Sequence, residues 1–216
     1  MKRVFLFIAT VFFTVSLCAQ SMKPVGDEAA FKSKMQASAS KINTIQSDFV
    51  QNKYMAGLTT AIKSSGKFYY QKEDKMALSY TKPMKSQMVM NGSKMMMAAG
   101  GKKNVVDASS NKLMGEMKNV MAACFTGDLK NMSSNYKMEF FEDAGNYMVK
   151  ITPKDEKAKA YVAHVELYLD KKDMSMSKMV MVQPVKTGKK TGDYTEYVFS
   201  NKKFNAPIDA SNFKVD

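Results

Sequence analysis

The chain has 216 residues, a length that suits one domain built around one core. It contains only two cysteines, which excludes a scaffold framed by several disulfides. Its formal net charge is +13, and it has 21 methionines but no tryptophan. Methionine is unbranched and polarizable, so this composition favours apolar surfaces that adapt to partners of variable shape, although an ordinary core would use the same residue.

The first 19 residues have the pattern of a secretory signal peptide. Lys2 and Arg3 precede an apolar run from Val4 to Leu17, which is too short to span a membrane comfortably. Ala19 suits the last position before cleavage. We therefore expect residues 1–19 to be removed and residues 20–216 to form a single soluble, exported domain.

Cleavage after Ala19 removes Cys18 and leaves Cys124 as a lone cysteine. Lipidation of Cys18 is an alternative fate of this segment. Export argues against nucleic acid as the partner of so basic a chain. Export instead favours anionic membrane surfaces or acidic proteins as partners. The simple alternative is that the charge only gives a well-solvated exterior.

The mature chain begins with a helical pattern. Asp27 is a suitable N-cap, and the apolar residues that follow recur near every 3.6 residues, namely Phe31, Met35, Ile42, Ile45 and Phe49. This spacing predicts an amphipathic helix from about Glu28 to Ser47.

The pattern then changes to a period of two, which is typical of strands. Before the middle of the chain, strands are predicted at Ile62–Tyr70, Met76–Tyr80, Gln87–Met90, Lys94–Ala98 and Asn104–Val106. Turn signals separate the last three, at Asn91-Gly92 and Gly100-Gly101.

A second amphipathic helix is predicted at Leu113–Phe125, where apolar residues return to helical spacing. Strands resume at Tyr136–Phe141, Tyr147–Ile151, Tyr161–Leu169, Met174–Val182 and Tyr194–Phe199, with turns at Asp143–Asn146, Pro153–Lys159, Asp170–Asp173 and Thr187–Gly192. About eleven strands without βαβ alternation predict an α+β fold with an antiparallel, strongly curled or closed sheet. The helices would then cover its concave apolar face.

Many methionines are spaced by two, so each pair should share one face of a strand. The pairs are Met88 and Met90, Met95 and Met97, Met174 and Met176, and Met179 and Met181. Paired thioethers also bind Cu(I), and Met174-Ser175-Met176 has the required spacing. A Met-based copper carrier is therefore one alternative reading.

No sequence feature indicates an enzyme or a cofactor. The single histidine, His164, falls on the polar face of its strand, where an exposed position is expected. Cys124 falls on the apolar side of its helix, and Glu142 and Asp143 are adjacent in a turn, where solvated charges are expected. The common nucleotide, hydrolase and metalloprotease motifs are absent from the sequence, and no catalytic or metal-binding residue is assigned.

The order of motifs resembles the periplasmic lipoprotein carrier family, the LolA-like proteins, over nearly all of the mature chain. The matching segments are Asp48-Phe49-Val50-Gln51, Gly66-Lys67-Phe68-Tyr69-Tyr70, Met76–Tyr80 closed by Pro83, Asn91-Gly92, Leu113–Phe125, Ile151-Thr152-Pro153-Lys154 and Asn205–Phe213. Two features depart from the family. Lys72-Glu73 stands where an Arg-Pro pair is common, and Leu78 and Met96 stand where cavity tryptophans are common.

The resemblance implies a half-open antiparallel β-barrel whose helices form a lid over a hydrophobic cavity. It also implies a monomeric carrier that receives lipoprotein acyl chains from an inner-membrane ABC transporter and delivers them to an outer-membrane receptor. The residues expected to bind acyl chains are Phe68, Tyr70, Met76, Leu78, Tyr80, Met88, Met90, Val149, Ile151, Leu167, Leu169, Met179 and Met181, with lid contacts from Leu113, Met117 and Met121. A lipid-sensing envelope domain is the second alternative.

Overall fold

A computed structural model describes residues 22–72, 75–107, 120, 132, 134–188 and 192–215. Its strands are β1 (Lys23–Pro24), β2 (Thr44–Tyr54), β3 (Ile62–Gln71), β4 (Lys75–Lys82), β5 (Ser86–Asn91), β6 (Lys94–Ala99), β7 (Lys102–Asp107), β8 (Tyr136–Glu142), β9 (Asn146–Pro153), β10 (His164–Asp170), β11 (Met176–Val182) and β12 (Tyr194–Phe204). Its helical segments are α1 (Glu28–Ala39), α3 (Glu156–Lys159) and the short 3₁₀ helix η3 (Ala210–Phe213). Among the described helices, none is long and apolar enough to cross a membrane.

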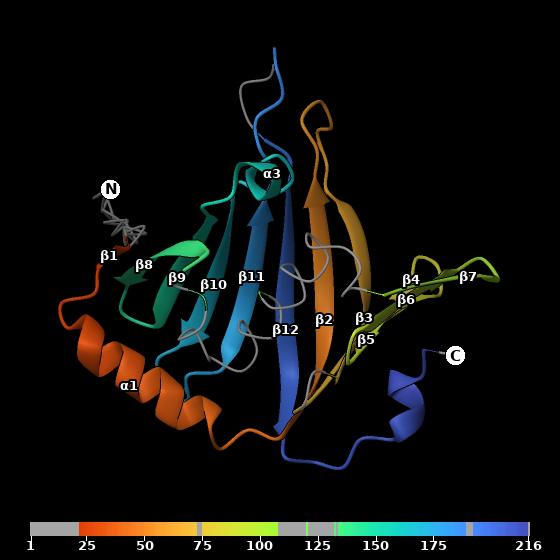
Figure 1. Cartoon of the computed structure of the whole chain (residues 1–216), viewed down its shortest axis with the longest axis horizontal. Helices are drawn as coiled ribbons and strands as arrows, with labels where there is room; N and C mark the ends of the chain where they lie inside the picture. The colour runs from red at the N-terminus through yellow and green to blue at the C-terminus, as the bar shows by residue number, and fades with distance from the viewer. Residues whose placement is uncertain are drawn as a thin grey trace, which may run out of the picture.

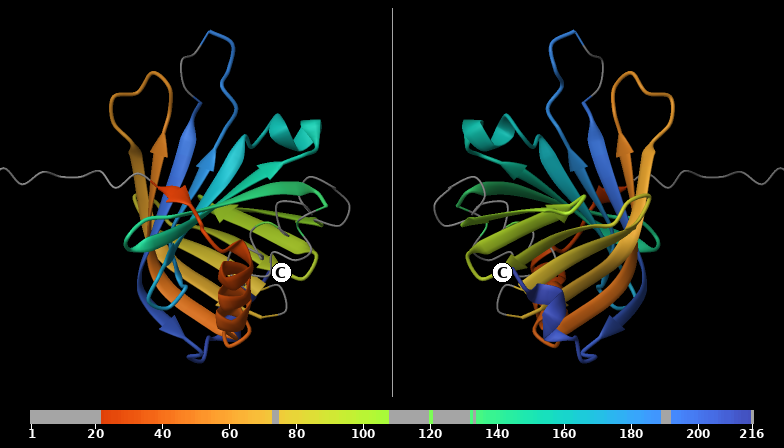
Figure 2. Two further views of the ribbon diagram at one scale, coloured as in Figure 1. Left: turned by 90° about the vertical axis from the view of Figure 1, so that its left-hand side faces the viewer. Right: turned by 90° about the vertical axis from the view of Figure 1, so that its right-hand side faces the viewer.

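The described strands form one antiparallel sheet of 12 strands in the order β1-β8-β9-β10-β11-β12-β2-β3-β4-β5-β6-β7. The last strand, β12, pairs with β2 and so joins the two halves of the chain into one surface. The sheet is strongly twisted and curved, with β1 and β7 as its two unpaired edges (Figures 1 and 2). The predicted α+β class with an open, curled antiparallel sheet is therefore confirmed, with β1 and β2 in addition to the predicted strands.

Short turns set the register of the hairpins. Asn91 pairs with Lys94 across the β5–β6 turn, and Gly92 has φ +58°, a left-handed value that glycine adopts without strain. Ala99 pairs with Lys102 across the next turn, at Gly100-Gly101. The sequence signals for both hairpins are thus confirmed.

The N-terminal helix is shorter than predicted. Asp27 caps it by accepting a hydrogen bond from the Ala30 amide at 2.9 Å, but α1 ends at Ala39 and β2 begins at Thr44. Ile45 and Phe49 are therefore strand residues. Their spacing of four fits one face of a helix and one face of a strand equally well, so the periodicity alone could not separate the two.

Three other boundaries also differ from the prediction. The predicted turn at Pro153–Lys159 contains α3, which is capped by the Asp155 carboxylate. The predicted strand Tyr161–Leu169 begins only at His164, because α3 and its exit occupy the preceding residues. Met174 lies before β11 in a turn with φ +61°, so Met174 and Met176 are not a pair on one strand.

Apolar residues gather on both faces of the sheet, in very unequal amounts. The larger group, which we call the inner cluster, draws on α1 and on strands from β2 to β12, and it includes Met132. The smaller group, the outer cluster, consists of Ala77, Val89, Met96 and Phe213 with a few partly buried neighbours. The C-terminal segment around η3 covers the outer cluster, whereas α1 lies against the edge near β8 and β9 (Figure 1).

Candidate functional site

The inner cluster contains every strand residue that the sequence assigned to the acyl-binding face. Those buried in it are Phe68, Tyr70, Met76, Leu78, Met90, Val149, Ile151, Leu167, Leu169 and Met179, and those partly buried against it are Tyr80, Met88 and Met181. The predicted lid contacts, Leu113, Met117 and Met121, lie outside the described residues. Two other residues of that part of the chain, Val120 and Met132, belong to the inner cluster or pack against it.

Strand register explains how these residues meet. Phe68 on β3 faces Leu78 on β4, and Leu78 in turn faces Met88 on β5. In the other half of the sheet, Val149 on β9 faces Leu167 on β10, which faces Met179 on β11. Since side chains directly opposite one another share a face, each row presents a continuous apolar band.

Several members of the inner cluster were not in the predicted site. Phe31 of α1 packs on Phe140 of β8 and Tyr147 of β9, with ring centroids 5.4 and 4.7 Å away. Phe49 and Phe199 come from the paired strands β2 and β12. Assigning Ile45 and Phe49 to a strand would have revealed this part of the face, because Ile45, Ser47 and Phe49 alternate in the sequence.

A pair of partly buried tyrosines packs against the inner cluster. The Tyr80 and Tyr197 oxygens lie 3.5 Å apart, and Phe49 packs edge-on against Tyr80 with ring centroids 5.0 Å apart. Burial raises the pKa of both tyrosines, and the pKa of Tyr197 rises far above its usual range. Both phenols therefore stay neutral at any physiological pH and supply hydrogen-bonding atoms without charge.

A third hydroxyl on the same face has no hydrogen-bond partner among the described residues. Ser47 is buried between Ile45 and Phe49 on β2, and its Oγ atom makes no hydrogen bond within the described structure. A buried hydroxyl that lacks a partner is unfavourable, so this atom is a polar position available to a bound molecule.

The methionine pairs differ in where they lie. Met88 and Met90 meet the inner cluster, as do Met179 and Met181. Met95 is buried in it, whereas Met97, on the same face of β6, is exposed.

Met96 is not part of the inner face, although the family resemblance aligned it with a cavity position. It faces Val89 across the β5–β6 hairpin and belongs to the outer cluster, because β6 turns alternate side chains to opposite faces. Leu78, the other aligned position, does lie in the inner cluster.

The polar residues considered for catalysis have structural partners. Glu142 binds the Lys171 ammonium at 2.7 Å, whereas Asp143 accepts hydrogen bonds from the Gly145 and Asn146 amides in its turn. The Lys171 ammonium holds the pKa of Glu142 below its usual range. The two carboxylates therefore have separate partners.

His164 is half-buried rather than exposed, because its ring lies against the side chain of Glu166, with its Nε2 atom 3.3 Å from a carboxylate oxygen. No group of three or more His, Cys, Asp or Glu side chains that could hold a metal occurs among the described residues. Lys72, at the position where the family commonly has arginine, donates a hydrogen bond to the Ser40 carbonyl at 3.1 Å. This contact ties the end of β3 to the end of α1.

These features define a class of protein: an open, curved antiparallel sheet whose inner face is one extended apolar cluster and whose edge is covered by an N-terminal helix. The chain belongs to the LolA family, since residues 40–216 match the family model described as outer membrane lipoprotein carrier protein LolA. No curated protein sequence matches the chain.

Solved structures are similar to this chain at low sequence identity. The MucA/MucB complex of Pseudomonas aeruginosa matches with a TM-score of 0.50 and 14% identity, over 88% of this chain and 62% of that chain. LppX of Mycobacterium tuberculosis matches with a TM-score of 0.44 and 10% identity, over 88% of this chain and 100% of that chain. The chain spans less than two thirds of the matched chains in the first two structures, at 62% and 64%.

Proposed function

We propose that this protein is a periplasmic carrier that holds the acyl chains of a lipoprotein against its inner cluster and performs no covalent chemistry. The observation that carries the proposal is the inner cluster itself, which extends across strands from both halves of the sheet. Membership of the lipoprotein carrier family supports the same conclusion.

The composition of the inner cluster suits an acyl chain. Each methylene group moved out of water contributes roughly 0.8 kcal/mol, so a site for acyl chains requires a long apolar surface rather than a few specific contacts. Met76, Met90 and Met179 line this surface, and their unbranched side chains adapt to chains of different length and path.

The polar atoms on the face would recognise the part of the cargo that joins acyl chain to protein. Ser47 and the Tyr80–Tyr197 pair offer neutral hydroxyl groups, which suit the carbonyl oxygens of ester and amide linkages. We extend the proposal to the family's route, in which a monomer receives cargo from an inner-membrane ABC transporter and releases it to an outer-membrane receptor.

A displacement assay tests the proposal. The purified protein should bind a fluorescent acyl probe, and a synthetic triacylated lipopeptide should displace the probe, whereas the same peptide without acyl chains should not. Failure of the lipopeptide to compete would remove lipoproteins as the cargo. Failure of the probe itself to bind would contradict acyl binding altogether.

The two other candidate functions predict different results. A Met-based copper carrier should bind Cu(I) stoichiometrically and independently of the acyl probe. A lipid-sensing domain should bind acyl chains and a regulatory protein together but should not pass its lipid to acceptor membranes. The MucA/MucB structure is of a complex, so a protein of similar fold can associate with a protein partner.

A further inference from the structure

Two loops project side by side beyond one end of the sheet (Figures 1 and 2). One joins β2 to β3 through residues 55–61, and the other joins β11 to β12 through residues 183–193, of which 183–188 and 192–193 are described. We call the described parts of these loops, with the strand ends Lys53, Tyr54, Ile62, Lys63 and Tyr194, the hairpin tip. The inner cluster does not include the hairpin tip.

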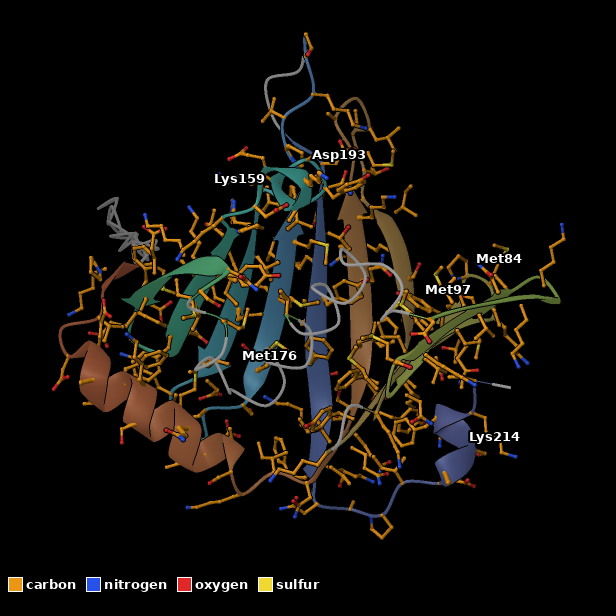
Figure 3. All side chains as sticks on the ribbon, in the orientation of Figure 1. Met84, Met97, Lys159, Met176, Asp193 and Lys214 are labelled. Carbon is orange, nitrogen blue, oxygen red and sulfur yellow. The ribbon has the colours of Figure 1, made fainter. Side chains whose placement is uncertain are left out.

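Specific contacts hold the two loops together. The rings of Tyr54 and Tyr194 stack with centroids 4.4 Å apart and an interplanar angle of 15°. The Ala56 amide donates a hydrogen bond to the Asp193 carboxylate at 2.8 Å, at the base of the loops (Figure 3). The two loops of the hairpin tip are therefore held together as one surface.

The first loop presents an apolar side chain on an ordered turn. The Leu58 amide donates to the Met55 carbonyl at 3.0 Å, and Gly57 has φ +105°, a value that other residues rarely adopt. Leu58 is consequently held outward with 54% of its surface exposed, and residues 55–61 contain no charged side chain.

Exposed apolar residues gather at this end of the molecule. Val185 in the second loop is 58% exposed, and Ile62 at the start of β3 is 48% exposed. Single exposed apolar residues need no explanation, but several on two adjoining loops mark a contact surface.

The charges around these residues are mainly positive. Lys53 and Lys63 flank the first loop, and Lys186 follows Val185 in the second. Asp193, the acidic residue among the described residues of the hairpin tip, accepts a hydrogen bond from the Ala56 amide and lies 3.9 Å from Lys186. The hairpin tip thus combines apolar ends, stacked tyrosines and lysines.

That combination matches the boundary of a phospholipid bilayer. Apolar side chains enter the acyl region, tyrosines favour the headgroup level, and lysines reach anionic phosphates. We propose that the hairpin tip docks the protein on anionic phospholipid membranes, with Leu58 and Val185 entering the bilayer. The inference rests on the hairpin tip alone and does not depend on what the inner cluster binds.

Vesicle sedimentation tests the proposal. The purified protein should sediment with vesicles of phosphatidylethanolamine and phosphatidylglycerol and only weakly with phosphatidylcholine vesicles, and added salt should weaken binding. Leu58→Asp should weaken binding at least roughly tenfold, because it places a charge where an apolar side chain entered the bilayer. The matched control is Met84→Asp, since Met84 is 74% exposed but lies away from the hairpin tip (Figure 3).

Fluorescence gives an independent readout because the natural chain has no tryptophan. Leu58→Trp should shift its emission to shorter wavelength when anionic vesicles are added, and Met84→Trp should not. Absence of vesicle binding by the natural protein, or equal responses at positions 58 and 84, would overturn the proposal. The exposed side chains of the hairpin tip would then indicate a protein partner.

Discussion

On strands β4, β5 and β6, the inner and outer clusters use opposite faces of the sheet, yet the two clusters differ in size and in chemistry. On the outer face, Val89 packs with Phe213, and the Asn91 side chain donates to the Phe213 carbonyl at 3.0 Å, so a short C-terminal segment closes a small apolar patch. On the inner face, aromatic and methionine side chains form a far larger surface that includes Ser47, a buried hydroxyl without a partner in the described structure.

This contrast separates two uses of burial. In the outer cluster, a few strand side chains pack against the C-terminal segment around η3, as in a structural core. The inner cluster combines a large apolar area, adaptable side chains and neutral hydroxyl groups. These properties suit a site that binds and releases a ligand. The two faces should therefore respond differently to similar changes.

The largest expected effect comes from placing a carboxylate on each face. Val89 is fully buried in the outer cluster, and Leu78 is 2% exposed in the inner cluster. Val89→Glu should cost more than about 4 kcal/mol of unfolding free energy, since a buried carboxylate finds no partner there. Leu78→Glu should leave the protein folded but weaken acyl-probe binding at least roughly 30-fold, because the carboxylate keeps water in the site.

Circular dichroism and denaturant titration would measure folding of both variants, and probe fluorescence would measure binding. Unfolding of Leu78→Glu to the same extent as Val89→Glu would mean that the inner cluster is an ordinary core. Unchanged binding by folded Leu78→Glu would remove Leu78 from the site.

Truncating the cover of the outer cluster should have the next largest effect. Phe213→Ala should lower the unfolding free energy by about 3 kcal/mol, because a buried ring is lost from η3 and a cavity remains. Phe204→Ala is the control, since Phe204 is partly exposed, and it should cost less than about 1 kcal/mol. Acyl-probe binding by both folded variants should match that of the natural protein; a large loss in Phe213→Ala would show that the two faces are coupled.

Two buried serines test the polar atoms of the inner face. Ser175 is buried and accepts a hydrogen bond from the Lys202 ammonium, whereas the Ser47 hydroxyl has no hydrogen-bond partner among the described residues. Ser175→Ala should therefore cost about 1–2 kcal/mol, while Ser47→Ala should be neutral or stabilise by up to about 1 kcal/mol. Thermal unfolding without cargo would measure both, and an equal loss in Ser47→Ala would contradict the unpartnered state of its hydroxyl.

The smallest effect concerns the partly buried ion pair of Glu142 and Lys171. The Lys171 ammonium lowers the pKa of Glu142 below its ordinary value of 4.5, so their interaction stabilises the fold above that pH and is lost as pH falls through the lowered pKa. Glu142→Gln should therefore be slightly less stable than the natural protein at neutral pH. The difference in melting temperature should shrink toward zero in acid, and a difference that grows on acidification would contradict this assignment.

Period-two patterns predicted the inner face well in the second half of the chain. In β9, Val149 and Ile151 are buried, whereas Lys150 and Thr152 between and beyond them are partly exposed. The pattern failed at Ile45 and Phe49, where a spacing of four suits both helix and strand. It could not show that Phe31 would meet Phe140, because that contact depends on where α1 lies against distant strands.

The resemblance to the family also could not show which face of the sheet Met96 occupies. The resemblance supplied a position, but the register of the β5–β6 hairpin decides which way that side chain points. The sequence contains no strong pattern for the hairpin tip either, since Leu58 and Val185 are far apart in sequence and their two loops come together only through the pairing of β12 with β2.

Mass spectrometry of the protein purified intact from the periplasm tests the central claim most directly. The account predicts that acylated lipoproteins or other acyl lipids travel with the natural protein and are depleted from folded Leu78→Glu, while folded Phe213→Ala retains them. Recovery of natural protein free of acyl lipids, together with failure to load them in vitro, would contradict the assignment of the inner cluster as a lipid-binding face.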